Sequence, residues 1–143
     1  MGYFFFMSNT FPKIEHLYGV KRIERLHLQG RAFMSFPFRV VYRIEDDENE
    51  TVPVRVMVSA PKKKFKKAVD RNRIKRLMRE SYRLNKSKLV EFAVKNNLKL
   101  HVSFQYVSDE IMIFSEMNNK MQKALEKLIK TVSENTKIAD ENG

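Results

Sequence analysis

Residues 62–88 read KKKFKKAVDRNRIKRLMRESYRLNKSK, and this stretch decides how the rest of the chain must fold. It holds thirteen lysines and arginines against two acidic residues, which gives a net charge of +11. The whole chain also has a net charge of +11, so the remaining residues together carry none. All of the excess positive charge is therefore concentrated in one continuous segment of an otherwise neutral protein.

The middle of this segment has the periodicity of an amphipathic helix, at about 100° per residue. One arc holds the apolar and small side chains Ile74, Leu77, Met78, Ser81 and Leu84. The opposite arc is almost purely cationic and holds Asn72, Lys75, Arg76, Arg79, Arg83 and Lys86. Asp70 occupies the place of an N-cap, and Glu80 can pair with Arg76 one turn earlier. We expect the apolar stripe to pack on a sheet, which turns the cations toward solvent.

This cationic face has two interpretations. When lysine and glutamate are mixed along a helix face, that face usually contacts solvent and binds no partner. Acids are nearly absent here, and like charges three and four residues apart destabilise a lone helix. Arginine, which suits bidentate contacts with phosphate, outnumbers lysine within residues 71–83. A polyanion with regularly spaced phosphates is the partner that explains this face most simply.

Length and composition limit the class of protein. A chain of 143 residues with 43% hydrophobic and 11% aromatic residues can form one domain with a core. It has no cysteine, which excludes disulfides and cysteine-ligated zinc and fits a cytoplasmic protein. The three histidines, His16, His27 and His101, lack metal-ligand spacing. No apolar run is long enough to span a membrane, and residues 1–7 lack the features of a signal peptide.

Hydrophobic periodicity predicts an α+β fold, a small two-layer sandwich with the order α-β-β-(β)-α-β-α. The expected elements are a helix at residues 20–28, strands at 36–44 and 52–58, the basic helix up to 84 with a weaker helical run after it, a strand at 98–106 and a helix at 115–132. We expect the first two strands to pair as a hairpin across a solvated acidic turn, residues 45–50.

Individual residues have expected places in these elements. The packed side of the first helix holds Val20, Ile23, Leu26 and His27, and Gly30 is its C-cap. One face of the first strand holds Phe36, Phe38, Val40, Tyr42 and Ile44. Core packing against the last helix is the ordinary role for these phenylalanines, whereas the hydroxyl of Tyr42 favours an accessible position.

The chain divides into three parts by composition. Residues 1–10 form an N-terminal extension, residues 11–132 form a single domain, and residues 133–143 form a polar tail that we expect to be frayed.

The stretch AVDRNRIKRLMRESY, residues 68–82, closely resembles the signature of the bacterial ribonuclease P protein subunit. All fixed positions of that signature are present, namely Ala68, Val69, Arg71, Asn72, Arg73, Lys75, Arg76, Arg79 and Glu80. A weaker resemblance extends over residues 11–132 and includes Phe11-Pro12-Lys13, Gly30 and Tyr42.

The resemblance implies a fold and an activity. The fold would be an α+β sandwich with a left-handed strand–helix–strand crossover. The activity would be endonucleolytic removal of the 5′ leader of precursor tRNA, with a large RNA as the catalyst and Mg²⁺ held mainly by that RNA. The implied partners are the catalytic RNA, one protein bound per RNA, and precursor tRNA, without DNA or a membrane.

Site residues also follow from the resemblance. The contacts to the catalytic RNA would be Arg71, Asn72, Arg73, Lys75, Arg76, Arg79 and Arg83, joined by the loop residues Lys62, Lys63 and Lys64. A cleft for the leader would be formed by Tyr42, Val40, Phe38, Phe36, Ile23 and His27. The chain departs from the family at two places: Ile23 and His27 replace aromatic residues, and the lysine loop lacks a glycine and contains one additional residue.

Three other functions fit parts of the pattern. A ribosomal or RNA-chaperone module would bind RNA without affecting cleavage of precursor tRNA. A helix-turn-helix DNA binder would need a helix and tight turn before the basic helix, where a strand and a lysine loop stand instead. A membrane-surface helix would need an apolar face free of the core and rich in large aromatics, which residues 71–84 do not offer.

Overall fold

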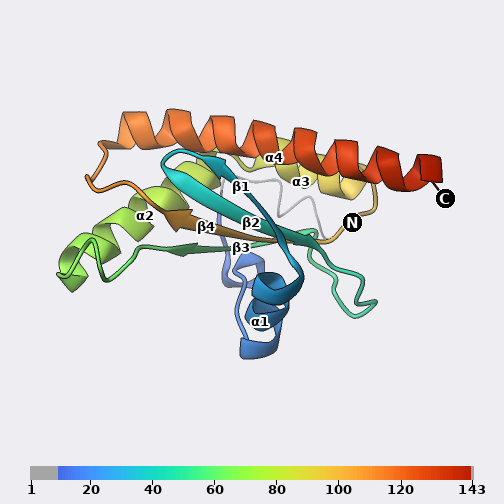
Figure 1. Cartoon of the computed structure of the whole chain (residues 1–143), viewed down its shortest axis with the longest axis horizontal. Helices are drawn as coiled ribbons and strands as arrows, with labels where there is room; N and C mark the ends of the chain where they lie inside the picture. Colours follow the sequence, from blue (N-terminus) through green and yellow to red (C-terminus); the bar gives the residue numbers. More distant parts are fainter. Residues whose placement is uncertain (1–9, 143) are drawn as a thin grey trace.

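The protein is built around one four-stranded sheet, with α2, α3 and α4 on one side and the short α1 on the other (Figure 1). The computed structural model describes residues 10–142. In order, the elements are the 3₁₀ helix η2 (Lys13–Glu15), α1 (Val20–Gln29), β1 (Arg31–Ser35), β2 (Phe38–Ile44), β3 (Val54–Ser59), α2 (Ala68–Asn85), α3 (Ser87–Lys95), β4 (Leu100–Tyr106) and α4 (Phe114–Asn142). The predicted α+β class is confirmed. Within residues 10–142, no helix combines the length and the apolar character needed to cross a bilayer.

The order of the strands differs from the predicted hairpin. The sheet has the order β1-β2-β4-β3, so β4 separates the two strands that were expected to pair. The hairpin partner of β2 is β1, a strand that periodicity did not specify, and the two are joined through Phe36 and Pro37. β3 pairs in parallel with β4, with Val56 opposite Val102, and α2 and α3 connect them. The left hand expected for this crossover stays a prediction.

The main core lies between the sheet and the helices α2, α3 and α4. Because side chains alternate along a strand, Phe38, Val40 and Tyr42 share the face that these helices cover. The helices α2 and α4 cover it with apolar side chains that are fully buried or nearly so, namely Ile74, Met78, Tyr82, Met117, Met121, Leu125 and Leu128. This packing fixes α2 on the sheet and leaves its cationic arc on the outside.

A smaller cluster fixes α1 on the opposite face. Leu17, Leu26 and Val41 are buried together there, with Ile23 and Met57 packed beside them. The predicted bounds of this helix are confirmed to within one residue, but its packed side is narrower than expected. Val20 is 73% exposed and His27 is also exposed, because only the Leu26 side of the helix faces the sheet.

Gly30 ends α1, although not in the left-handed conformation of a usual glycine C-cap. Its φ is −76°, and its N–H donates to Leu26 O at 2.9 Å. A Cβ at this position would lie 2.3 Å from Leu26 O and 3.0 Å from Tyr42 O. Glycine is therefore required by the close approach of two backbone segments, which lets β1 begin directly after the helix.

Two predictions about α2 are wrong, and α4 is longer than predicted. The N-cap of α2 is Lys67, and Asp70 lies inside the first turn, where its charge still suits the positive end of the helix dipole. Lys86 is only 1% exposed, although its place in the cationic arc predicted a solvated side chain. Helix α4 continues to Asn142 through the segment that was expected to be a frayed tail.

The burial of Lys86 is explained by an ion pair with Glu15. The Lys86 Nζ donates to Glu15 Oε1 at 2.6 Å, and both side chains are almost fully enclosed. Burial raises the pKa of Glu15, and the hydrogen bond and charge of Lys86 partly oppose that rise. The pair joins η2 to the junction of α2 and α3, two segments far apart in the sequence.

Replacing Lys86 by methionine is expected to lower the free energy of unfolding by about 3–5 kcal/mol, because the Glu15 carboxylate loses its partner inside the protein. Urea denaturation at pH 7 measures this loss. The double variant Glu15→Gln/Lys86→Met removes both charges and should recover most of the stability. A double variant as unstable as Lys86→Met alone would contradict this account of the pair.

The free energy of unfolding of the single variant Lys86→Met should also depend on pH. Without Lys86, burial raises the pKa of Glu15 unopposed, so the folded state binds the proton more tightly than the unfolded state. The contribution of protonated Glu15 to the stability of Lys86→Met is complete below the pKa of Glu15 in the unfolded chain, about 4.3. This contribution is lost as the pH rises through the pKa of Glu15 in the folded protein. The stability gap between Lys86→Met and the wild type should therefore shrink from pH 7 to pH 5.

Candidate nucleic-acid interface

The outward face of α2 carries a row of cations. Asn72, Arg73 and Arg76 are exposed, and Lys75 and Arg79 are half-buried at the edge of the face. The side chains of Arg73, Lys75, Arg76 and Arg79 make no hydrogen bond or ion pair with the side chains described, those of residues 10–136. The helix holds these like charges together because its opposite arc is buried in the core. The face is thus ready to receive an anion without first breaking an ion pair.

Glu80, the second of the two acids on α2, pairs with Arg83 and not with Arg76 as predicted. The Arg83 Nη2 donates to Glu80 Oε1 at 2.6 Å. This hydrogen bond lowers the pKa of Glu80, which keeps the carboxylate ionised. The pairing holds Arg83 at one end of the face and leaves Arg76 free for a partner.

The lysine loop, residues 62–67, is fixed against the start of α2. Arg71 Nη1 donates to Phe65 O at 2.8 Å and to Lys66 O at 2.9 Å. Phe65 is buried against Tyr106, and the Phe65 N–H donates to Pro61 O at 3.1 Å. The loop therefore has an apolar anchor at the place where the expected family pattern has glycine.

The three predicted loop cations have different surroundings. Lys62 and Lys63 are exposed beside the N-terminus of α2. Lys64 is tied to the segment after β4, since its Nζ donates to Val107 O at 2.6 Å and lies 3.1 Å from Asp109. The loop and α2 thus form one continuous cationic surface, which we call the α2 surface: the face of α2 around Arg73, Lys75, Arg76 and Arg79, together with Lys62 and Lys63.

The predicted leader cleft does not exist as a single surface. Phe38, Val40 and Tyr42 are 0%, 0% and 4% exposed beneath the helices, whereas Ile23 packs on the opposite face of the sheet. Phe36 is 56% exposed in the β1–β2 turn, and His27 is exposed on α1 with its Nδ1 2.9 Å from Ile23 O. The sheet separates these groups because α1 packs on the face that holds Val41.

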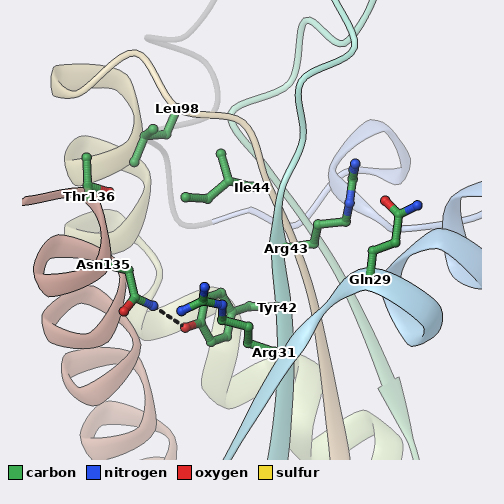
Figure 2. Close-up of a pocket in the computed structure, with 8 residues that line it drawn as sticks. All are labelled: Gln29, Arg31, Tyr42, Arg43, Ile44, Leu98, Asn135 and Thr136. Atoms are coloured by element: carbon green, nitrogen blue, oxygen red, sulfur yellow. Dashed lines mark hydrogen bonds between the residues drawn. The ribbon is translucent and has the colours of Figure 1, made fainter. Parts of the chain in front are cut away.

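One predicted cleft residue, Tyr42, does reach a cavity. A pocket of about 420 Å³ opens at the edge of the sheet and is lined by Gln29, Arg31, Tyr42, Arg43, Ile44, Leu98, Asn135 and Thr136. Asn135 Nδ2 donates to the Tyr42 hydroxyl at 2.8 Å. Figure 2 shows Arg31, Tyr42 and Asn135 together on one side of the strands, with Gln29 and Arg43 on the other. We call this cavity the edge pocket.

Sequence reasoning missed Arg31 and Asn135 as members of this pocket. Arg31 begins β1, whose existence the periodicity left open, and it shares a face with its partner Tyr42. Asn135 lies on the part of α4 that was expected to be a frayed tail. No local signal marks either residue, because the pocket forms only when α4 crosses the sheet edge.

The acidic turn, residues 45–50, also differs from the prediction. Glu45 and Glu50 are buried, and His101 lies between them, with its Nε2 3.1 Å from Glu50 and its Nδ1 3.5 Å from Glu45. Burial alone would raise the pKa of each carboxyl, but hydrogen bonds from Arg43 and Arg55 lower both pKa values overall. Burial lowers the pKa of His101 against the opposing pull of the two carboxylates. This network is structural and joins β4 to the loop before β3.

Comparison with known proteins places the chain in a family context. The family model described as ribonuclease P matches residues 11–132. The chain is 39% identical over 117 residues to the "Ribonuclease P protein component" of Porphyromonas gingivalis, covering 76% of this chain and 85% of that protein. It is also 39% identical over 82 residues to the component of the same name from Chlorobaculum tepidum, covering 56% and 53% of the two chains.

The fold has a counterpart among solved structures. The Staphylococcus aureus RNase P protein superposes with a TM-score of 0.63 at 20% identity, over 80% of this chain and 94% of that one. At this identity the match concerns the fold alone. It agrees with the α+β arrangement described above.

Replacing Arg71 by methionine is expected to loosen the lysine loop, because both hydrogen bonds to Phe65 O and Lys66 O are lost. Hydrogen bonds from a charged donor contribute about 1.5–3 kcal/mol, so the Phe65 amide should exchange with solvent at least about tenfold faster. Arg73→Met is the matched control, since Arg73 is exposed and holds no loop carbonyl. Hydrogen exchange followed by NMR distinguishes the two variants, and equal rates would mean that Phe65 alone fixes the loop.

Proposed function

The chain belongs to the ribonuclease P protein component family, and on this premise we propose that it is the protein subunit that promotes removal of the 5′ leader from precursor tRNA. In this proposal it binds the catalytic RNA through the α2 surface, as one protein per RNA. The single observation that carries the proposal is the row of unpaired cations on α2, set within the matched signature at residues 68–82.

The physical basis of RNA binding is neutralisation of phosphate charge. Each contact between a cation and a phosphate releases condensed counterions, so affinity falls as the salt concentration rises. Arginines without partners can approach phosphates bidentately and keep their charge at every accessible pH. The α2 surface supplies several such groups on a rigid helix, which gives the RNA a fixed docking direction.

The chemistry of cleavage is assigned to the RNA partner in this proposal. Mg²⁺ bound to that RNA would activate the attacking water and stabilise the leaving oxygen. The protein would contribute by neutralising phosphates, so that the folded RNA and its substrate approach with less repulsion. Its role is therefore electrostatic and positional.

The proposal is tested by a cleavage assay at low Mg²⁺. The protein is combined with the ribonuclease P RNA of its own genome and a precursor tRNA. We expect accurate 5′ cleavage under conditions in which the RNA alone is inactive. Binding to the RNA without any effect on cleavage would instead identify a general RNA-binding or chaperone module.

Within this assay, Arg76→Ala should weaken assembly with the RNA, because one unpaired arginine at the centre of the α2 surface is lost. The slope of log affinity against log salt concentration should become shallower by about 0.7–0.9. Lys95→Ala is the control, since Lys95 is exposed at the end of α3, outside the α2 surface. Equal slopes for wild type and Arg76→Ala would remove α2 from the interface.

For the 5′ leader we propose the edge pocket in place of the divided cleft. Its volume of about 420 Å³ lies in the range of sites that hold small ligands, about 300–1,000 Å³. Arg31 has no hydrogen bond or ion pair with the side chains described for residues 10–136 and can bind a phosphate. Asn135 and the Tyr42 hydroxyl offer polar atoms to a base or a ribose beside it.

Arg31→Ala should therefore weaken binding of leader-containing precursor tRNA by about three- to tenfold relative to mature tRNA, since one charged contact of roughly 0.7–1.4 kcal/mol is lost. Arg39→Ala is the matched control, because Arg39 is exposed on the other face of β2 and bonds Gln105 at 3.0 Å. Affinities of both RNAs for the assembled holoenzyme are compared. An equal loss for both RNAs would place the leader elsewhere.

A further inference from the structure

The segment before α1 is held rigidly along the flank of α2. The Glu15–Lys86 ion pair joins it to the end of α2, and Leu17 N donates to Val56 O at 2.9 Å along the free edge of β3. Arg55 Nη1 donates to Ile14 O at 2.5 Å. These contacts fix the position of the backbone of this segment beside α2.

His16 is the residue that this segment places at the flank. Its ring stacks on Phe11, with centroids 4.0 Å apart and planes at 27°, and Phe11 meets the edge of Tyr82 at 5.1 Å. The His16 Nε2 lies 3.3 Å from Phe11 O, so it is the nitrogen that donates in the neutral ring. Nδ1 is then the atom that is left to accept a proton.

Two cations on different elements lie close to this imidazole. The His16 N–H donates to Lys13 O on η2 at 3.0 Å, and the Lys13 side chain is exposed. Arg79 lies one turn before Tyr82 on α2, and Tyr82 is the residue against which Phe11, the stacking partner of His16, packs. Burial, followed by the charges of Arg79 and Lys13, lowers the pKa of His16 below its ordinary value, although its bond to Phe11 O works against the shift. These contacts place His16 close to two positive charges, which oppose its protonation in the free protein.

The other charged and titratable groups near His16 do not compensate for these cations. Glu15 is turned inward and committed to Lys86. Arg55 donates to the backbone oxygen of His16 at 3.5 Å and forms no hydrogen bond with its imidazole ring. Burial raises the pKa of Tyr82, so its hydroxyl stays neutral. An anion that supplied two negative oxygens here would meet no competing carboxylate among these neighbours.

We propose that Lys13, His16 and Arg79 together bind one backbone phosphate of the RNA partner, and that His16 gains a proton when the phosphate is bound. A phosphate between the two cations removes their repulsion of an imidazolium and adds an attraction of its own. The inference rests on the proposed function, since it takes the RNA as the partner of the α2 surface. It extends that surface from one helix to a second segment of the chain.

The test measures affinity for the ribonuclease P RNA at pH 6, 7 and 8, at fixed ionic strength and Mg²⁺ concentration. Uptake of one proton makes affinity rise as the pH falls, by up to tenfold per pH unit, until the pH drops below the pKa of the free protein. For the wild type we expect an increase of about three- to tenfold from pH 8 to pH 6. His16→Gln should remove this increase, and His16→Arg should keep a high affinity that no longer depends on pH.

Calorimetry gives a readout that a purely structural role of His16 would not change. Titrations at pH 7 in two buffers of different ionisation enthalpy report the protons taken up on binding. The wild type should take up more than His16→Gln, while His27→Gln, which changes an exposed histidine on α1, should match the wild type. Because the RNA is the same throughout, its own proton uptake cancels in these differences.

The outcomes separate this inference from the proposed function. If Arg76→Ala weakens binding but His16→Gln and Lys13→Ala keep the affinity and proton uptake of the wild type, the phosphate site is overturned and the function stands. If Arg76→Ala also binds like the wild type, the proposed function fails. Should His16→Gln unfold, Lys13→Ala decides alone, since Lys13 is exposed: it should lower affinity several-fold, and an unchanged affinity overturns the site.

Discussion

The buried ion pair between Glu15 and Lys86 is the constraint on which the other arrangements depend. It is enclosed on all sides and joins residues 71 positions apart, so it can form only when η2, α2 and the sheet are all in place. If either Glu15 or Lys86 were missing, the other would remain as an unpaired charge in the core, which strongly destabilises the folded state. The pair thereby links the position of the N-terminal segment to that of the basic helix.

The charged residues of the protein fall into two groups, those paired in the interior and those left unpaired on the α2 surface. The buried or half-buried charges of the interior, such as Glu45, Glu50, Arg43 and Arg55, are paired within the protein. The central cations of the α2 surface have no such partners among the side chains described, up to residue 136. Since like charges on one helix repel, the core packing of Ile74 and Met78 must outweigh that repulsion in the free protein. A polyanion would relieve it, so binding and stability act in the same direction.

Local pattern was enough to predict some features and insufficient for others. The stripe of Ile74 and Met78 and the apolar residues at every second position of β4 are periodic signals of the core, and both are confirmed. The other face of β4 is buried as well, which the alternation did not predict. The place of β4 between β2 and β3 has no local signal, because it depends on pairing between strands distant in the chain. Periodicity also assigned Lys86 to solvent, because a local pattern contains no information about Glu15, which lies far away in the sequence.

The candidate site shows the same limit at the level of single residues. The signature around Arg76 identified the cationic helix because every member lies within a few turns of it. The edge pocket and the neighbourhood of His16 join three or more segments, so neither Arg31 beside Asn135 nor His16 beside Arg79 could be read from spacing. The divided cleft has another cause. The alternation along β2 was predicted, but the face of the sheet that α1 covers has no local signal, and Ile23 packs beside Val41, on the face opposite Val40. Residues of a motif within one helix can therefore be placed together from the sequence, whereas the residues of a cleft can be placed only when the packing of the helices on the sheet is known.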